Sequence, residues 1–262
     1  MHIAAHRHPS SLKSPTLTDG RPTRACVECD PVKSCFASFI RTDKAEQFEK
    51  LLFVCRRVPR HSSLYCEKDQ FEMLYVVRFG HFKLLRVDAA DEQRVAHFYM
   101  PGDLVGVNAI GTDRHNFTLM ALENSEVFEG AFKAISMLIA AAPNLQRDFL
   151  KLMRVALNDQ NVRSSMLALP SLDERLANFL LQLSERYGRL GYSKRSFRLI
   201  MTRDDIGSYL GTTVERVSRV ISRFNTQGAC FIAGRTVELR NPAFLHSILG
   251  NCDDGIATSQ VG

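Results

Sequence analysis

Three cysteines near the start of the chain form the first pattern that could do chemistry. Cys26, Cys29 and Cys35 have the spacing C-x2-C-x5-C, while the other four of the seven cysteines are scattered. Closely spaced thiolates are suited to hold an iron–sulfur cluster or a zinc ion, and a reducing compartment disfavours disulfides. Because such centres usually take four ligands, the pattern predicts a metal site completed by a ligand from elsewhere.

The segment from Arg203 to Ser222 predicts a helix-turn-helix. Thr202 is suited to cap the first helix, whose first turn is acidic, and Gly211 permits a tight turn. Thr212 or Thr213 is suited to cap the second helix. Two short helices joined in this way are a framework for reading DNA, with the second helix in the major groove.

The second helix of this segment has an apolar face and a polar face. Arginine can bond both acceptors of guanine, glutamate can accept from the amino group of cytosine, and serine can do either. A helix anchored through its apolar face therefore presents such side chains to base edges. The apolar residues are Val214, Val217, Val220, Ile221 and Phe224. The residues predicted to contact DNA are Thr213, Glu215, Ser218, Arg219, Ser222 and Arg223.

The charge distribution points to the same part of the chain. The net charge is +6 at pH 7, and residues 151–240 alone hold 15 Lys and Arg against 8 Asp and Glu. The rest of the chain is therefore close to neutral. A basic C-terminal part predicts a polyanionic partner for that part, and double-stranded DNA suits the predicted helix-turn-helix.

The remaining segments predict the elements that position these residues. From about residue 58 to 130, short β-prone runs alternate with turn residues, which is typical of an antiparallel β-roll. A long helix is expected from about Pro143 to Ala168, and Ser171 with Glu174 forms a capping-box pattern before the next helix. A hairpin at 229–240 predicts a wing. The fold class is thus α+β, with a β-roll, a long helix and a C-terminal winged helix-turn-helix.

These elements divide the chain into predicted domains. They are a disordered arm (1–25), a cysteine loop with the β-roll (26–142), the long helix (143–169), the winged helix-turn-helix (170–248) and a tail (249–262). The long helix carries an apolar stripe that packs either on its own domain or against a second subunit. The stripe residues are Leu145, Phe149, Leu152, Met153, Ala156 and Leu157.

Two classes of protein are disfavoured by what the sequence lacks. No apolar run reaches the ~18–20 residues that cross a bilayer, and the N-terminus has no signal-peptide pattern. We therefore expect a cytoplasmic protein without a membrane partner. No phosphate loop, Gly-x-Ser-x-Gly or HExxH pattern is present, so we expect a protein that is not an enzyme.

Three features of the chain resemble the Crp/Fnr superfamily of bacterial transcription regulators. They are the PGDLVG turn of the β-roll, the long central helix, and the sequence VERVSRVISRF. The resemblance covers about residues 26–245 and is closest to the Fnr branch, whose recognition helix shows E-x-x-S-R, here Glu215, Ser218 and Arg219. It implies a TTGAT-like half-site in an inverted repeat, and a homodimer joined along the 143–168 helix.

The same resemblance bears on two further partners. RNA polymerase is an expected partner, and the exposed turn at Phe98–Asp103 is a candidate contact for it. Cyclic-AMP binders of the superfamily carry a phosphate-gripping cassette in which an arginine precedes Ser or Thr and then Ala. Here Arg114 is followed by His and Asn, so no cyclic nucleotide is expected.

The cysteine cluster matches the N-terminal pattern of Fnr-type oxygen sensors, which implies a 4Fe-4S cluster. Those sensors take their fourth cysteine from the β-roll, at a position where this chain has Phe128. Cys66 is the first candidate substitute and Cys55 the second. Glu126, Glu129 or an external ligand are further alternatives.

A second departure from the Fnr pattern lies in the long helix. Gln160 aligns where oxygen-sensing relatives carry an aspartate whose repulsion weakens the cluster-free dimer. A neutral residue removes that repulsion, so the dimer is expected to persist without a cluster. The resemblance then implies a regulator that binds DNA under low oxygen and loses affinity when oxygen dismantles the cluster.

Two alternatives stay open. The first is a Crp/Fnr-type regulator without a cluster, which senses redox state through thiols or binds zinc. The second, from another class of protein, is an iron–sulfur electron carrier. Iron content after anaerobic purification separates the first alternative from a cluster-bearing regulator, and turnover of a redox substrate without DNA binding would favour the second.

Overall fold

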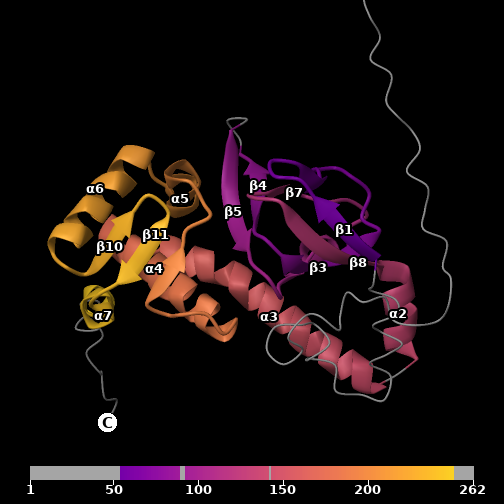
Figure 1. The fold of residues 1–262 in the computed structure, drawn as a ribbon. Coiled ribbons are helices and arrows are strands. Elements are labelled where there is room, and N and C mark those ends of the chain that lie inside the picture. The colour runs from indigo at the N-terminus through magenta and orange to yellow at the C-terminus, as the bar shows by residue number, and fades with distance from the viewer. Residues whose placement is uncertain (1–53, 89–91, 142, 251–262) are drawn as a thin grey trace, which may run out of the picture. The chain divides into compact units, whose positions relative to one another are not determined.

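The β-roll that the sequence predicts is built from eight strands. The computed structural model describes residues 54–88, 92–141 and 143–250, and at 159–162 it describes the backbone alone. The strands are β1 (Val54–Val58), β2 (Ser63–Tyr65), β3 (Met73–Phe79), β4 (Phe82–Val87), β5 (Gln93–Tyr99), β6 (Leu104–Val105), β7 (Thr118–Ala121) and β8 (Ser125–Ala131). They form two antiparallel sheets, with the orders β1-β8-β3-β6 and β2-β7-β4-β5 (Figure 1).

The interior of the roll is filled by the apolar side chains that alternate along these strands. Gly80 closes the tight turn between β3 and β4 with φ +85°, and a Cβ there would lie 2.1 Å from the Oγ of Ser125. Only glycine therefore fits this turn. The buried residues of the interior are Val58, Leu64, Tyr65, Tyr75, Val77, Phe82, Leu84, Tyr99, Val105, Leu119, Ala121 and Val127.

Helices connect the roll to the C-terminal module. A short 3-10 helix, η2 (Val107–Ala109), lies within the roll, and α2 (Phe132–Ala140) follows β8. The long helix α3 spans Pro143–Leu167, within one residue of the predicted extent. The predicted capping box then begins α4 (Leu172–Arg189): Ser171 Oγ accepts from Glu174 N at 3.1 Å, and the Glu174 carboxylate accepts from Ser171 N at 3.3 Å.

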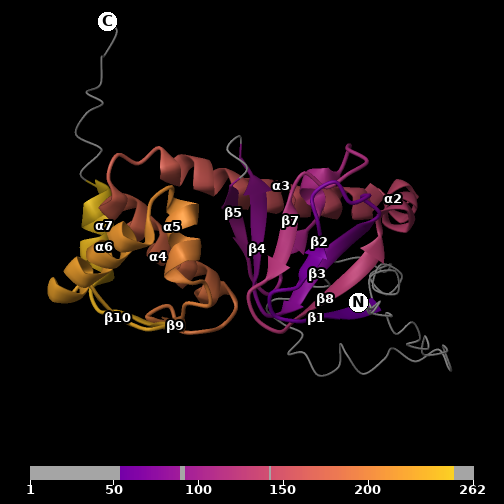
Figure 2. The ribbon, with the colours of Figure 1, turned by 90° about the horizontal axis from the view of Figure 1, so that it is seen from above.

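The C-terminal module is a winged helix-turn-helix. Its elements after α4 are β9 (Ser196–Arg198), α5 (Arg203–Leu210), α6 (Val214–Thr226), β10 (Cys230–Ala233), β11 (Thr236–Leu239) and α7 (Pro242–Gly250). The three strands form one antiparallel sheet in the order β10-β11-β9. Figure 2 shows this sheet beside α4 and α6. The β10–β11 hairpin is the predicted wing, and it turns at Gly234, where φ is +56°.

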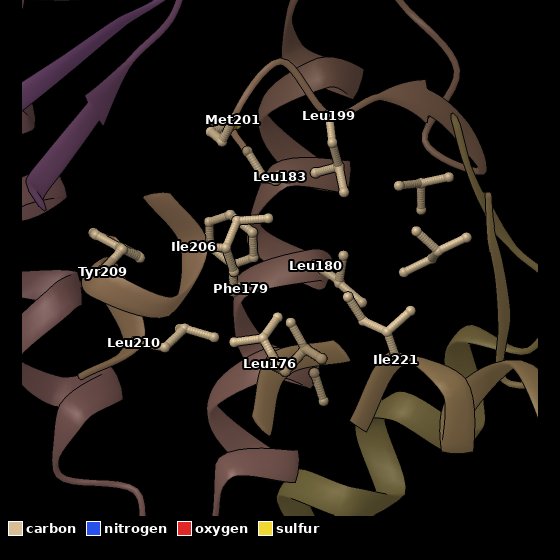
Figure 3. Close-up of a cluster of buried hydrophobic side chains, with 14 of the residues drawn as sticks. Leu176, Phe179, Leu180, Leu183, Leu199, Met201, Ile206, Tyr209, Leu210 and Ile221 are labelled. Carbon is tan, nitrogen blue, oxygen red and sulfur yellow. The ribbon is translucent and has the colours of Figure 1, made fainter. Parts of the chain in front are cut away.

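One apolar cluster holds the helices of this module together (Figure 3). Buried residues recur along α4 at spacings of three and four, and this helix packs against α5, α6 and α7. The labelled members are Leu176, Phe179, Leu180 and Leu183 of α4, Ile206, Tyr209 and Leu210 of α5, Ile221 of α6, and Leu199 and Met201 of the β9–α5 connection.

The architecture confirms the predicted fold class. An antiparallel β-roll, a long helix and a winged helix-turn-helix follow one another along the described chain. Within the described ranges, every helix is either too short or too polar to cross a bilayer.

Candidate nucleic-acid interface

The first helix of the helix-turn-helix is fixed at its N-terminus by a capping box. Thr202 Oγ accepts from Asp205 N at 3.0 Å, and the Asp205 carboxylate accepts from Thr202 N at 3.0 Å. Lys83 of β4 donates to the same carboxylate at 2.7 Å. Burial alone would raise the pKa of Asp205, but the bonds from Lys83 and Thr202 outweigh burial and lower it. The aspartate therefore stays ionised and anchors α5.

The turn between α5 and α6 needs two glycines. Gly211 ends α5 with φ +68°, a left-handed conformation that glycine adopts without steric cost. A Cβ on Gly207 would lie 3.0 Å from the backbone oxygen of Thr212, so the two helices approach closely only without a side chain there. Thr213 occupies the N-cap position of α6, as predicted for Thr212 or Thr213, but its hydroxyl makes no cap bond to the helix.

The hydroxyl of Thr213 bonds instead to the carboxylate of Glu215. That bond, together with the backbone N–H of Glu215 and the charge of Arg219, lowers the pKa of Glu215. Glu215 is therefore an ionised acceptor at neutral pH. It lies at the N-terminal end of α6, where the helix dipole also favours a negative charge.

The two predicted faces of α6 are separated cleanly in the structure. Val217, Val220, Ile221 and Phe224 are buried in the module's core, while Val214 is only half-buried. Ser218 donates its hydroxyl proton to Val214 O at 2.8 Å, which leaves the oxygen free to accept. The exposed residues between positions 213 and 223 are Thr213, Glu215, Arg216, Ser218, Arg219, Ser222 and Arg223, and they include all six predicted DNA contacts.

Two features of this surface were not predicted from the sequence. Arg223 forms an ion pair with Asp173 in the first turn of α4. Arg203, the first residue of α5, lies beside the wing, where its Nη2 donates to Gly234 O at 3.5 Å. Its Nη1 is buried and finds no hydrogen-bond partner among the described residues, and burial lowers its pKa. Neither arrangement has a local sequence pattern, because both depend on tertiary contacts.

The predicted metal ligands are placed only in part. Cys26, Cys29 and Cys35 lie outside the described residues. Cys66 is exposed in the turn after β2, and its N–H donates to the Asp69 carboxylate at 2.7 Å. Among the described residues, no three or more His, Cys, Asp or Glu side chains come together as a metal site. The described part of the roll therefore offers single ligands and no complete site.

Cys55 has a more informative position than Cys66. In the β1–β8 pairing Cys55 lies directly opposite Phe128, the position at which the Fnr pattern implies a cysteine. Cross-strand partners on one face of a sheet have Cβ atoms about 5 Å apart. The Cys55 thiol is exposed, and its Sγ lies 3.9 Å from both Arg78 Nη1 and Glu126 Oε2. The ring of Phe128 lies under the Arg78 guanidinium, 5.7 Å away.

The apolar stripe predicted for α3 serves two different surfaces. Leu145 and Leu152 are buried within the chain itself, which corrects their assignment to an intersubunit seam. Phe149, Met153 and Ala156 are half-buried, and the side chain of Gln160 lies outside the description. Leu157 is 46% exposed, and Leu150, which the predicted stripe omitted, is 60% exposed.

The turn predicted as an exposed contact, Phe98–Asp103, is largely covered. Phe98, Tyr99 and Met100 are buried, and Gly102 and Asp103 are half-buried. Arg186 of α4 pairs with Asp103 and also donates to Phe98 O at 3.0 Å. The expectation of an exposed turn was therefore wrong, because Phe98 packs against the C-terminal module and Tyr99 packs in the interior of the roll.

The arginine at the position of the cyclic-AMP cassette lies on the outside of the roll. Arg114 is exposed and donates to Lys68 O at 2.8 Å. Its neighbour His115 is buried and stacks on Tyr65, with ring centroids 3.7 Å apart. Two aromatic rings thus occupy this part of the interior.

Comparisons with known proteins agree with this geometry. The family model of the Crp-like helix-turn-helix domain matches residues 174–248, and that of the cyclic nucleotide-binding domain matches residues 55–141. The chain is 32% identical over 225 residues to the fumarate nitrate reduction regulatory protein of Klebsiella oxytoca, covering 86% of this chain and 90% of that protein. It is 31% identical over 226 residues, with the same coverage, to the corresponding protein of Escherichia coli K12.

Solved structures of the same architecture also match. FixK2 from Bradyrhizobium japonicum has a TM-score of 0.68 at 25% identity, covering 74% of this chain and 96% of FixK2. A transcriptional regulator of the Crp family from Thermus thermophilus has a TM-score of 0.59 at 20% identity, covering 74% of this chain and 96% of that protein, and shows the fold alone.

The roll, the long helix and the winged module define a DNA-binding transcription regulator, not an enzyme. The chain belongs to the Fnr branch of the Crp/Fnr superfamily, with the fumarate and nitrate reduction regulatory proteins as relatives.

Proposed function

We propose that the protein is a homodimeric regulator that reads a TTGAT-type inverted repeat and responds to oxygen or redox state. One observation carries the DNA-reading part of this proposal. The helix α6 is anchored by a buried apolar face and presents Glu215, Ser218 and Arg219 on its exposed face. This arrangement suits a recognition helix in a major groove.

The chemistry of that face fits base reading. Arg219 is an exposed donor that can bond both guanine acceptors, and the ionised Glu215 can accept from a cytosine amino group. Ser218 keeps an acceptor oxygen free. Thr213 and Ser222 lie at the two ends of the same exposed face and suit backbone or base contacts.

The homodimer is supported by the exposed side of α3. Leu150, Met153 and Leu157 follow one another at spacings of three and four, the seam pattern of paired helices. Leu150 and Leu157 are 60% and 46% exposed in the single chain, so a second subunit could bury both. Gln160 continues the same spacing. A seam along this side brings two recognition helices about one DNA turn (~34 Å) apart.

The proposed sensor is the cysteine loop, with Cys26, Cys29 and Cys35 as three ligands. We propose Cys55 as the fourth ligand in preference to Cys66, because Cys55 lies across from Phe128. The Cys55 thiol is exposed, so a metal centre beside the roll can reach it. An iron–sulfur cluster held there would supply an oxygen-labile centre next to the roll.

A pair of single variants tests the fourth ligand. Cys55→Ala should lower the iron and acid-labile sulfide content of anaerobically purified protein, together with its visible absorbance. Cys66→Ala is the matched control and should leave all three unchanged. The reverse result would make Cys66 the fourth ligand. If neither variant lost iron and sulfide, the fourth ligand would be a carboxylate or an external group.

A regulator without a cluster is the second candidate function. The exposed thiols of Cys55 and Cys66 and the three N-terminal cysteines would then serve thiol redox sensing or zinc binding. Anaerobically purified protein that is colourless, free of iron and rich in zinc would favour this candidate.

Two partner assignments complete the proposal. No cyclic nucleotide is proposed, and the outward position of Arg114 and the Tyr65–His115 stack support that view. RNA polymerase stays a proposed partner, but the covered segment Phe98–Asp103 no longer offers its contact surface.

The experiment that tests the whole proposal is a DNA-binding titration. A TTGAT-N4-ATCAA duplex and a scrambled duplex are each titrated with protein under anaerobic conditions and again after exposure to air. Tighter anaerobic binding to the specific duplex, lost in air, is the expected result. Equal binding in both atmospheres would retain the regulator and remove the oxygen switch, and equal binding to both duplexes would overturn sequence-specific reading.

A further inference from the structure

An acidic residue stands at the edge of the proposed recognition surface. Asp173 is the second residue of α4, and its carboxylate forms an ion pair with the guanidinium of Arg223 on the exposed face of α6. The two side chains are 32% and 48% exposed, so the pair lies at the surface and within reach of a polyanion. The exposed face of α6 carries three arginines, and this ion pair engages one of them.

The position of Asp173 is fixed by its surroundings. The capping box of Ser171 and Glu174 orders the first turn of α4. Arg175 donates to Leu210 O at 2.8 Å, which ties this turn to the end of α5. In Figure 2 the helices α4 and α6 lie close together within the module, and both contribute to its apolar core. The fold therefore holds the backbone of Asp173 beside α6, where its carboxylate reaches the guanidinium of Arg223.

Arg219, the neighbouring arginine on α6, has different partners from Arg223. Arg219 lies one turn before Arg223 on the same helix, and within the described chain it forms no ion pair with an acidic residue of another element. The carboxylate whose charge it meets is Glu215, four residues earlier on the same helix. Arg219 and Arg223 thus differ in the one respect that matters for a polyanion. Within the described chain, Arg223 is paired with a carboxylate of another helix and Arg219 is not.

We propose that Asp173 withholds Arg223 from the DNA backbone and so sets the sequence-independent part of the affinity. The inference rests on the proposed function, in which α6 lies in the groove. A guanidinium that pairs with a phosphate releases a condensed counterion from the DNA. This release strengthens binding to every DNA sequence by the same amount. Holding one such group back in each subunit lowers non-specific binding and leaves base reading to Arg219 and Glu215. Asp173 is a positioning residue that acts through Arg223.

The test is the salt dependence of DNA binding by Asp173→Asn. Asparagine keeps the shape of the side chain and suits a helix start, and circular dichroism checks the fold. Freeing Arg223 should steepen the slope of log K against log salt by about 0.9 for each subunit. The advantage of the variant over wild type should then grow roughly tenfold as salt falls from about 200 mM to about 50 mM, equally on specific and scrambled duplexes.

Two further variants isolate the pair. Glu185→Gln removes a carboxylate from the same helix, where Glu185 pairs with Lys194, and so changes net charge by the same amount without freeing Arg223. It should leave the slope unchanged. Asp173→Asn combined with Arg223→Gln should lose the gain in slope. A slope that stays at the wild-type value in Asp173→Asn, or one that rises equally in Glu185→Gln, would overturn the inference.

The proposed function is judged in the same experiment by a different comparison. Wild-type protein must bind the specific duplex more tightly than the scrambled one at every salt concentration. If it does and the Asp173→Asn slope is unchanged, only the role of Asp173 fails. If wild-type protein does not discriminate, the recognition surface itself has been misassigned.

Discussion

The helices α6 and α3 are both amphipathic, but only α6 shows in its sequence what each face does. The apolar residues of α6 from Val217 to Phe224 are all buried, and its polar residues over the same stretch are all exposed. On α3 the apolar residues divide between two surfaces. Leu145 and Leu152 are buried in the chain, whereas Leu150 and Leu157 are exposed.

The difference lies in the number of partners that each helix has. α6 packs on one core and offers its other face to water or to a ligand, so polarity alone separates the two faces. α3 is proposed to pack on its own chain and on a second subunit, and both partners call for apolar side chains. Hydrophobic periodicity identifies apolar residues but does not say which partner covers them.

The largest effect that tests this comparison is loss of the buried face of α6. Phe224 is fully buried, so Phe224→Ala should lower the free energy of unfolding by about 3–5 kcal/mol through lost contacts and a cavity. Urea denaturation followed by circular dichroism measures it. Ser222→Ala on the exposed face is the control and should change stability by less than ~0.5 kcal/mol. If Phe224→Ala lowered the free energy of unfolding as little as Ser222→Ala, the buried face would not anchor α6.

The two leucines of α3 should respond in opposite ways. Leu152→Ala removes a buried side chain and should cost about 2–5 kcal/mol of stability while leaving subunit association unchanged. Leu150→Ala should leave the fold intact and weaken the dimer, because each subunit loses about 1.5–3 kcal/mol of apolar burial at the seam. Sedimentation at several concentrations, with thermal unfolding in parallel, separates the two results. If Leu152→Ala made the protein monomeric and Leu150→Ala did not, Leu152 would lie at the seam and the two faces would have to be exchanged.

Arg219→Ala probes the exposed face of α6. The variant should lose about 1–3 kcal/mol of binding to the TTGAT-type duplex and should relax selection for guanine. Competition titrations with duplexes substituted at each guanine measure both quantities. Equal weakening on every duplex would mean that Arg219 contacts only phosphate and that the base-reading role belongs to other residues of the face.

The last prediction concerns a buried histidine beside the inner side of α3, whose effect appears only when the pH is lowered. Burial lowers the pKa of His97 to about 3, helped by the charges of Arg186 and of Arg163 on α3. The unfolded chain has a histidine pKa near 6.5 and so binds more protons between these values. Stability from this group is complete above about pH 6.5 and falls as pH is lowered, by about 1 kcal/mol per pH unit.

A variant at His97 isolates this contribution. Urea midpoints of wild type and His97→Gln are compared at pH 7 and pH 5. The wild-type protein should lose about 2 kcal/mol more than the variant over that interval. Parallel pH profiles of the two proteins would show that His97 is hydrated or paired in solution.

What the sequence by itself determined is local. The capping box at Ser171, the N-cap at Thr202, the glycine turn at Gly211 and the two faces of α6 depend on residues a few positions apart, so their spacing predicts them. The β-roll was predictable as a class, because β-prone runs separated by turns leave few other architectures.

Only the tertiary structure decided which distant residues meet. The strand register that sets Cys55 opposite Phe128, the division of α3 between two surfaces, the covered turn at Phe98–Asp103 and the Asp173–Arg223 pair join segments far apart in the chain. Such contacts follow from the packing of whole elements, and in a sheet a shift of one residue in register changes every pairing along the strand. For this reason the composition of the exposed face of α6 was readable from the sequence, and the ion pair between Arg223 and Asp173 was not.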